Sequence, residues 1–251
     1  QTFLLAATMK PQLDSNQKAI TKKIRALVPD ATAIIFHGSR VRGLPSPTSD
    51  YDVMVFTPMR VELEECERIK EQLVQAFPDF KVDAVFGAER FLHATLAFEP
   101  YYRFWLENGV SAFGSLPRVK PYPRLYRDAL DSRLDIIRAE IDVVDVFNRS
   151  WYQKGRGYLR ILKQLILIEN ALRGDYRNES LWASVAETVG HPAFEILRNP
   201  PERHRIRQSM VKRLRRIAIQ KISSLRKENL HSKWTTSRYP RGLERNGKSK
   251  R

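Results

Sequence analysis

The chain has 251 residues, of which 42% are hydrophobic and 10% aromatic, and this composition excludes an intrinsically disordered protein. Its formal net charge of +16 favours a polyanionic partner over a small cationic substrate. No apolar run approaches the roughly 18–20 residues of a membrane span, so we expect no membrane partner.

The positive charge is concentrated in the second half of the chain. Residues 1–120 carry 15 Lys/Arg against 14 Asp/Glu, whereas residues 202–251 carry 17 against 3, a net of +14. We therefore predict that residues 203–251 contact nucleic acid, most simply RNA. The single cysteine, Cys66, excludes an internal disulfide and favours a cytoplasmic location.

The first half of the chain predicts alternating helices and strands. Apolar periodicity indicates helices over residues 11–28, 61–77 and 88–107, and strands over residues 32–36, 51–56, 80–86 and 110–113. A turn with a short helix over 38–43 and a Pro/Ser loop over 44–49 separate the first two strands. This order predicts a small mixed sheet with helices packed on it.

Three prolines within residues 117–123 predict a domain boundary. Beyond it the periodicity is wholly helical. Helices are expected over residues 126–147, 158–172, 181–189 and 206–225. We thus expect a domain over residues 1–118, a helical domain over 122–230 and a basic, flexible tail over 231–251.

A Gly-Ser turn and a pair of aspartates are the features that point to chemistry. Gly38 and Ser39 end the first predicted strand, and Asp50 and Asp52 open the second. Side chains two residues apart in a strand share a face, so both carboxylates project together beside the turn. This pattern suits a divalent metal that carries a nucleotide phosphate.

The pattern resembles the DNA polymerase β-like nucleotidyltransferase superfamily, and within it the minimal nucleotidyltransferases, whose turn commonly reads Gly-Ser-Arg-X-Arg-Gly as residues 38–43 do here. The superfamily's third carboxylate lies on a later strand, where this sequence has Asp83. The resemblance implies an α/β (α+β) nucleotidyltransferase domain with a small mixed sheet, here followed by an all-α helical domain and a basic tail.

The resemblance also implies roles for individual residues. Asp50, Asp52 and Asp83 would be the catalytic carboxylates and the ligands of Mg²⁺ or Mn²⁺, with Asp83 serving the metal that activates the acceptor hydroxyl. The candidate nucleotide-binding residues are Gly38, Ser39, Arg40, Arg42 and Ser49. His37 is interpreted as structural.

A competing motif lies near the end of the last predicted helix. Arg226 and His231 have the Arg-X4-His spacing of the HEPN ribonucleases, which are often encoded with minimal nucleotidyltransferases. The residue after the arginine, Lys227, departs from the usual Asn, Asp or His. We interpret the spacing as a chance match.

The resemblance and the charge together predict transfer of a nucleoside monophosphate from an NTP, such as ATP, to an acceptor hydroxyl with release of pyrophosphate. RNA is the favoured acceptor, including the 3′ end of a tRNA. The alternatives are an AMP-transferring, protein-modifying enzyme of the toxin–antitoxin type, an aminoglycoside nucleotidyltransferase, and a non-catalytic RNA-binding protein that keeps the fold. A homodimer is compatible with the resemblance.

Overall fold

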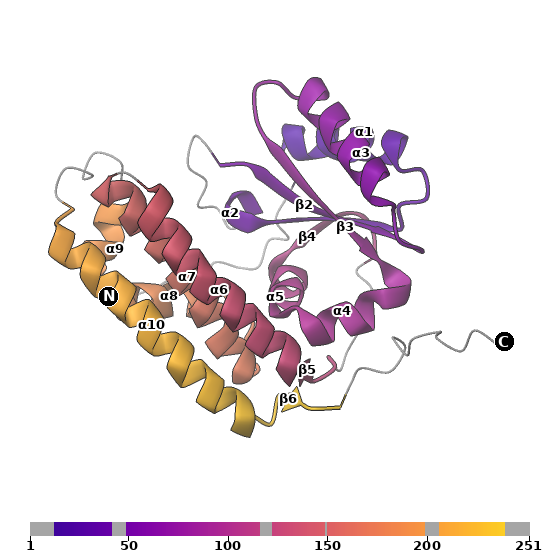
Figure 1. Ribbon diagram of the computed structural model, residues 1–251. Coiled ribbons are helices and arrows are strands. Elements are labelled where there is room, and N and C mark those ends of the chain that lie inside the picture. The colour runs from indigo at the N-terminus through magenta and orange to yellow at the C-terminus, as the bar shows by residue number, and fades with distance from the viewer. Residues whose placement is uncertain (1–12, 42–48, 116–121, 149, 199–205, 239–251) are drawn as a thin grey trace, which may run out of the picture. The chain divides into compact units, whose positions relative to one another are not determined.

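The computed structural model of the protein describes residues 13–41, 49–115, 122–148, 150–198 and 206–238 (Figure 1). The chain separates into two compact units. The first consists of Gln1–Leu92 with Asn108–Pro121, and the second of His93–Glu107 with Tyr122–Arg251. Among the described residues, no helix combines the length and the apolar character that a membrane span requires.

The first unit is built on a four-stranded mixed sheet, as the sequence predicts. Its strands lie in the order β3-β2-β1-β4, with β1 antiparallel to both β2 and β4 and β2 parallel to β3. The strands are β1 (Ala33–His37), β2 (Tyr51–Thr57), β3 (Val82–Ala88) and β4 (Val110–Gly114). The helices of this unit are α1 (Ser15–Leu27), α2 (Gly38–Val41) and α3 (Leu63–Ala76), with a 3₁₀ turn at Glu89–Phe91.

Helices α1 and α3 lie side by side and share a core with the sheet (Figure 1). Ile20 and Ile24 of α1, four residues apart, are fully buried there, as is Leu73 of α3. Because β2 and β3 are parallel, a crossover must connect them, and α3 supplies it. Val53 and Val55 of β2 both belong to this core, in keeping with its period of two.

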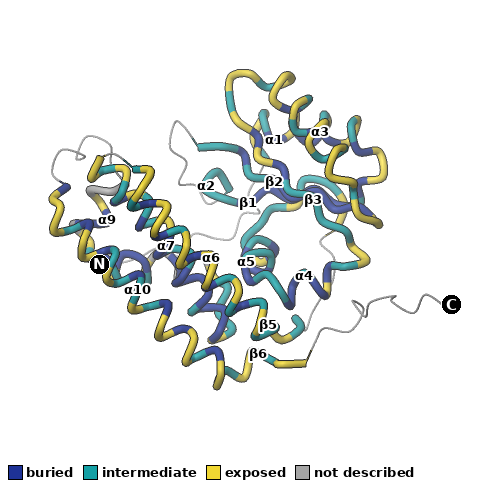
Figure 2. Tube along the Cα trace, viewed as in Figure 1, coloured by how far each residue is buried: buried dark blue, intermediate teal, exposed yellow. Residues whose placement is uncertain are grey.

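The second unit is helical, with one short two-stranded ladder. Its long helices are α6 (Arg127–Phe147), α7 (Trp151–Leu172) and α10 (Gln208–His231). The remaining elements are α4 (Leu92–Phe98), α5 (Pro100–Asn108), β5 (Leu125–Tyr126), α8 (Asn178–Val189), α9 (His191–Arg198) and β6 (Thr235–Thr236). Helix α7 contributes an apolar segment to the core of this unit, in which Leu165, Ile166 and Ile168 are fully buried. Buried and exposed residues alternate along α10, as expected of a helix with one face on a core (Figure 2).

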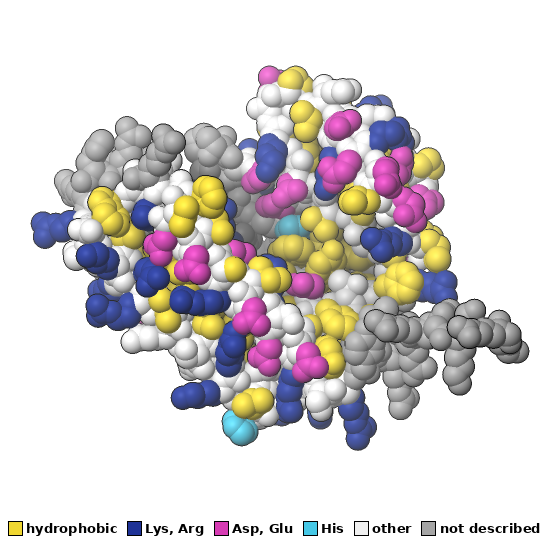
Figure 3. All heavy atoms as spheres, viewed as in Figure 1, with side chains coloured by type: hydrophobic (Ala, Val, Ile, Leu, Met, Phe, Trp, Pro, Cys, Tyr) yellow, Lys and Arg dark blue, Asp and Glu magenta, His cyan; other side chains and the backbone are white. Residues whose placement is uncertain are grey.

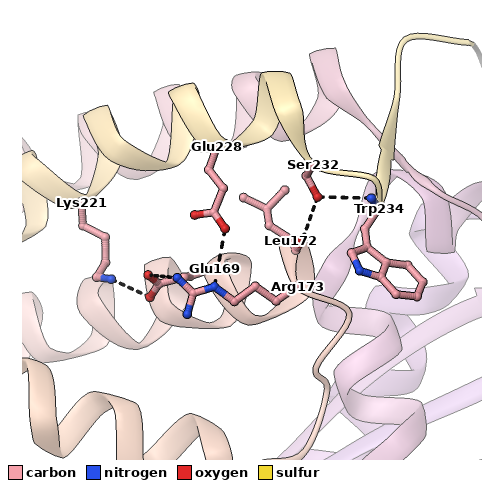
Figure 4. Close-up of polar contacts among 7 residues, drawn as sticks. All are labelled: Glu169, Leu172, Arg173, Lys221, Glu228, Ser232 and Trp234. Atoms are coloured by element: carbon pink, nitrogen blue, oxygen red, sulfur yellow. Dashed lines mark hydrogen bonds and ion pairs between the residues drawn. The ribbon is translucent and has the colours of Figure 1, made fainter.

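Ion pairs fix α10 against α7 (Figure 4). Lys221 Nζ lies 2.6 Å from Glu169 Oε2, and both side chains are more than four-fifths buried. Arg173 extends this network, because it pairs with Glu169 at 3.0 Å and with Glu228 at 3.5 Å. A network with buried members holds its geometry better than an isolated surface pair.

The end of α10 is also tied to the end of α7. Ser232 Oγ donates a hydrogen bond of 2.6 Å to the carbonyl oxygen of Leu172 and accepts one of 3.2 Å from Trp234 N–H (Figure 4). The Trp234 ring packs against Gly174, whose φ of +75° and lack of a side chain allow the contact. Part of the segment expected to be a flexible tail is therefore ordered.

Two features of the second unit differ from the sequence-based expectation. Residues 93–107, which carry most of α4 and α5, group with the helical unit although they precede the proline-rich segment. Strands β5 and β6 pair in parallel, with Leu125 N–H donating to the Trp234 carbonyl at 2.8 Å. The remainder of the predicted tail, residues 239–251, lies outside the described residues.

Candidate active site

The three predicted carboxylates come together in the first unit. Each of Asp50, Asp52 and Asp83 offers an oxygen, and these oxygens all lie within 4.8 Å of one another. The sheet register explains the cluster, because Asp52 on β2 is paired directly with Asp83 on β3. Asp50 precedes Asp52 by two residues and therefore projects to the same face.

The turn after β1 borders this cluster closely. Gly38 has a φ of +80°, which disfavours any residue with a side chain. A Cβ on Gly38 would lie 1.8 Å from Asp52 Oδ2, far inside van der Waals contact. His37 pairs with Asp52 across the antiparallel β1–β2 ladder, which places the turn beside the carboxylate. Position 38 therefore requires glycine for two reasons, namely its positive φ and the lack of room for a side chain beside the Asp52 carboxylate.

Tyr51, between the two aspartates, anchors the start of β2. Its side chain is almost fully buried on the opposite face of the strand, where its ring packs edge-on against Phe80 at 4.9 Å. Its hydroxyl accepts a hydrogen bond of 2.9 Å from Asn16 Nδ2. Because successive strand residues alternate faces, fixing Tyr51 inward directs Asp50 and Asp52 outward.

Arg40 of α2 is hydrogen-bonded to the backbone just before Asp50. Its guanidinium donates two hydrogen bonds to the carbonyl oxygen of Ser49, from Nε at 2.8 Å and from a terminal nitrogen at 2.6 Å. The same group lies 4.1 Å from the centroid of the Tyr51 ring, within cation–π range. Arg40 therefore fixes the backbone immediately before Asp50.

Lys81 is the cation nearest the cluster among the described ion pairs. Its Nζ lies 3.2 Å from Asp50 Oδ2, and the two side chains are 68% and 37% exposed. The hydrogen bond to Asp50, with smaller contributions from the charges of Asp83 and Asp52, raises the pKa of Lys81. Lys81 thus partly balances a local excess of negative charge.

The other predicted nucleotide-binding residues are placed as follows. Ser39 is half-buried in α2, directly after Gly38. Ser49 contributes its carbonyl oxygen to the contact with Arg40. Arg42 lies outside the described residues. His37 is buried at the end of β1, in keeping with a structural role.

Lys81 and Tyr51 are the site residues that the sequence analysis missed. The parallel register that pairs Asp52 with Asp83 also brings Lys81 beside Asp50, so the strand pairing would have indicated Lys81. The anchoring of Tyr51 depends on Asn16 and Phe80, which are distant in sequence and carry no local signal.

The donor set suits hard divalent cations. Three carboxylates from two adjacent strands supply oxygen ligands, which Mg²⁺ and Mn²⁺ prefer. The space beside them is kept open by Gly38, where a side chain would collide with Asp52. The residues present therefore fit a metal site.

One family model and several solved structures are similar to parts of this chain. The family model described as "Nucleotidyltransferase domain" matches residues 18–115, and a search of curated proteins found no match. A chain from a crystal structure of a mutant toxin–antitoxin MntA-HpeT is 20% identical, and a chain from a crystal structure of a toxin–antitoxin with AMP-PNP is 18% identical. Both matches cover 53% of this chain and 97% of the other, with a TM-score of 0.32, which is too low to bear on activity.

The matched span contains all four strands of the mixed sheet and the three clustered aspartates. Residues 18–115 therefore form a nucleotidyltransferase domain of the DNA polymerase β-like superfamily, and the protein is a nucleotidyltransferase enzyme.

Proposed function

We propose that the protein transfers a nucleoside monophosphate from an NTP to a hydroxyl group of an RNA and releases pyrophosphate. The acceptor oxygen forms a bond to the α-phosphorus, the bond from that phosphorus to the bridging oxygen breaks, and the hydroxyl proton passes to solvent. The observation that carries the proposal is the aspartate cluster beside the Gly38 turn, within the matched nucleotidyltransferase domain.

Asp50, Asp52 and Asp83 are the residues that would hold Mg²⁺ or Mn²⁺. When bound, these ions hold the triphosphate, lower the pKa of the attacking hydroxyl and balance the charge of the leaving pyrophosphate. Asp83 is the most exposed of the three carboxylates, which favours it as the one nearest the incoming acceptor. Asp52 lies beside the Gly38 turn, because a Cβ on Gly38 would come within 1.8 Å of its Oδ2.

The Gly38–Ser39 turn is the proposed contact for the triphosphate. Gly38 lets a phosphate approach the backbone, and Ser39 offers a hydroxyl and a backbone N–H as donors. Arg40 acts in this proposal mainly through Ser49, because its donors already hold that carbonyl oxygen. Arg42 remains a predicted phosphate contact.

The proposed RNA acceptor rests on charge. Helix α10 carries exposed cations along its length, and Lys and Arg side chains are spread over its visible surface (Figure 3). The exposed cations of α10 are Lys212, Arg213, Arg216, Arg226 and Lys227. Such a surface attracts a polyanion and repels a cationic aminoglycoside.

A labelling assay tests the proposal. Purified protein is incubated with Mg²⁺, each α-labelled NTP in turn, and total cellular RNA. We expect label on RNA with the wild type, loss of at least about 100-fold of that label with Asp52→Asn, and no loss with Asp79→Asn, an exposed aspartate in the turn before β3. Label on protein would support the protein-modifying alternative, and no label on RNA with any NTP would overturn the proposal.

A further inference from the structure

A basic pocket lies wholly within the helical unit. Its volume is about 490 Å³, within the range of pockets that take small molecules or single nucleotides. Residues of α7 and α10 and the last turn of α6 line it. Four of the lining residues are cationic, namely Lys154, Lys212, Arg215 and Arg216.

One acidic residue, Asp145, anchors the pocket. Its carboxylate accepts hydrogen bonds from the Tyr158 hydroxyl at 2.5 Å and from Arg215 Nε at 2.8 Å. Lys154 Nζ donates to the backbone carbonyl of the same residue at 2.7 Å. Arg215 thus neutralises Asp145, and both Arg215 and Lys154 are held in place.

The other two cations are available for an external anion. Lys212 and Arg216 are exposed on α10, and no ion pair joins either of them to an acidic side chain in the described part of the chain. With one carboxylate against four cations, the pocket carries a net charge of +3. That charge selects an anionic ligand with more than one negative group.

An exposed aromatic ring completes the pocket. Trp151, at the first position of α7, lines it with 41% of its surface exposed. Lys154 Nζ lies 5.5 Å from the centroid of its ring, so the aromatic surface and the positive charge are adjacent. Exposed aromatic rings next to Lys and Arg are the elements by which proteins bind unpaired bases together with their phosphates.

We infer that this pocket binds single-stranded RNA, with one base stacked on Trp151 and adjacent phosphates on Lys212 and Arg216. The inference deepens the proposed function, on whose RNA acceptor it rests, by giving the acceptor a binding site outside the aspartate cluster. Single-stranded RNA would contact the cations with its phosphates and stack a base on the Trp151 ring, whereas an acidic protein segment would contact the cations alone.

Binding of a fluorescently labelled 12-nucleotide RNA to the full-length protein, without NTP or metal, tests the inference. Lys212→Ala/Arg216→Ala is compared with Arg138→Ala/Arg160→Ala, which removes the same charge from exposed positions of α6 and α7 outside the pocket. The loss of two phosphate contacts should reduce the magnitude of the slope of log affinity against log salt concentration by about 1.4. It should also lower the RNA affinity at 0.1 M salt by about 25-fold. The control pair should leave the slope nearly unchanged.

Trp151 gives a second, independent measurement. Trp151→Ala should lower the RNA affinity by between about fivefold and 150-fold without changing the salt slope, because stacking involves no counterion release. Trp151→Phe should restore most of the affinity. Circular dichroism of each variant verifies the helical fold, and Trp151 begins a helix where alanine is well tolerated.

Equal losses of RNA affinity in the pocket pair and the control pair, or wild-type RNA affinity in Trp151→Ala, would overturn the inference. Either result would favour a protein partner for the pocket. Failure here is distinguishable from failure of the proposed function. RNA that binds through the pocket without receiving label contradicts the proposed transfer alone. If the pocket variants bind RNA as tightly as the wild type and still transfer label to it, only the assignment of the pocket is contradicted.

Discussion

The carboxylate of Asp52 occupies the space that a side chain at position 38 would need, since a Cβ on Gly38 would lie 1.8 Å from Asp52 Oδ2. The glycine of the turn and the aspartate of the next strand are therefore one geometric unit, separated by thirteen residues of sequence. The positive φ of Gly38 turns the chain sharply after β1 and keeps its backbone beside the carboxylate.

Gly38→Ala should remove transferase activity. The new methyl group must displace the Asp52 carboxylate, and a displacement of about 1 Å at a catalytic group costs about 100-fold in rate. Gly190→Ala is the matched control, because Gly190 has a similar φ of +85° and a Cβ there would meet no atom of the described residues within 4 Å. Both variants should lose about 1–2 kcal/mol of stability, but only Gly38→Ala should lose activity in the labelling assay.

Activity that falls equally in the two glycine variants would contradict this prediction, because backbone strain would then explain the whole effect. Metal titration of each variant adds a measurement that does not depend on turnover. We expect weaker Mn²⁺ binding in Gly38→Ala and wild-type binding in Gly190→Ala.

Arg40→Ala should weaken metal binding more than nucleotide binding. Arg40 holds the Ser49 carbonyl oxygen with two hydrogen bonds, and Asp50 is the next residue. Losing two charge-assisted hydrogen bonds at a partly exposed site costs about 1–3 kcal/mol, part of which should appear as a higher metal concentration for half-maximal activity. The labelling assay is titrated separately with Mg²⁺ and with NTP.

The predicted direct contact of Arg40 with phosphate gives the opposite pattern. In that case the KM for NTP would rise while the metal requirement stayed unchanged. Arg60→Ala, an exposed arginine after β2, serves as the control for the loss of one positive charge.

Lys81→Gln should tighten metal binding. The Lys81 ammonium group lies 3.2 Å from Asp50 and offsets negative charge that a metal ion would otherwise meet. Exposed pairs of this kind contribute at most about 1 kcal/mol, so we expect a gain in Mn²⁺ affinity of no more than about fivefold. Lys70→Gln, on α3 and paired with Glu67, is the control. Weaker Mn²⁺ binding in Lys81→Gln would contradict a purely competing role for the lysine.

The sequence predicted the parts of the site that follow from local periodicity. Asp50 and Asp52 share a face because strands alternate, whereas the resemblance to the superfamily pointed to Asp83, which lies within an apolar strand. The contact of Arg40 with Ser49 and Tyr51 was not predicted, since it joins residues nine and eleven positions apart that share no periodic pattern.

The fold shows the same division between local and distant information. The mixed sheet and the long helices follow from patterns of period two and 3.6, and the structure confirms them. The grouping of residues 93–107 with the helical unit has no local signal, because the prolines that suggest a boundary come later. Strands β5 and β6 have two residues each, too few to show any period.

Asp145→Asn should destabilise the helical unit at neutral pH, and to a smaller extent near pH 3. Burial alone would raise the pKa of Asp145, but hydrogen bonds from Tyr158 and Arg215 outweigh it and hold the pKa below its usual 3.8. A carboxyl group with a lowered folded-state pKa stabilises the fold above its unfolded pKa, and this contribution disappears as the pH falls through the folded value.

Urea unfolding at pH 7, 5 and 3, followed by circular dichroism, measures the difference between the wild type and Asp145→Asn. We expect about 1–2 kcal/mol at pH 7 and pH 5, discounted for the partial exposure of the pair, and a smaller difference at pH 3. Asp142→Asn, an exposed position on the same helix, should show little difference at any pH. If the difference in unfolding free energy between wild type and Asp145→Asn stays constant from pH 7 to pH 3, the prediction is contradicted. The side-chain packing of Asp145, and not its charge, would then stabilise the contact of α10 with α6 and α7.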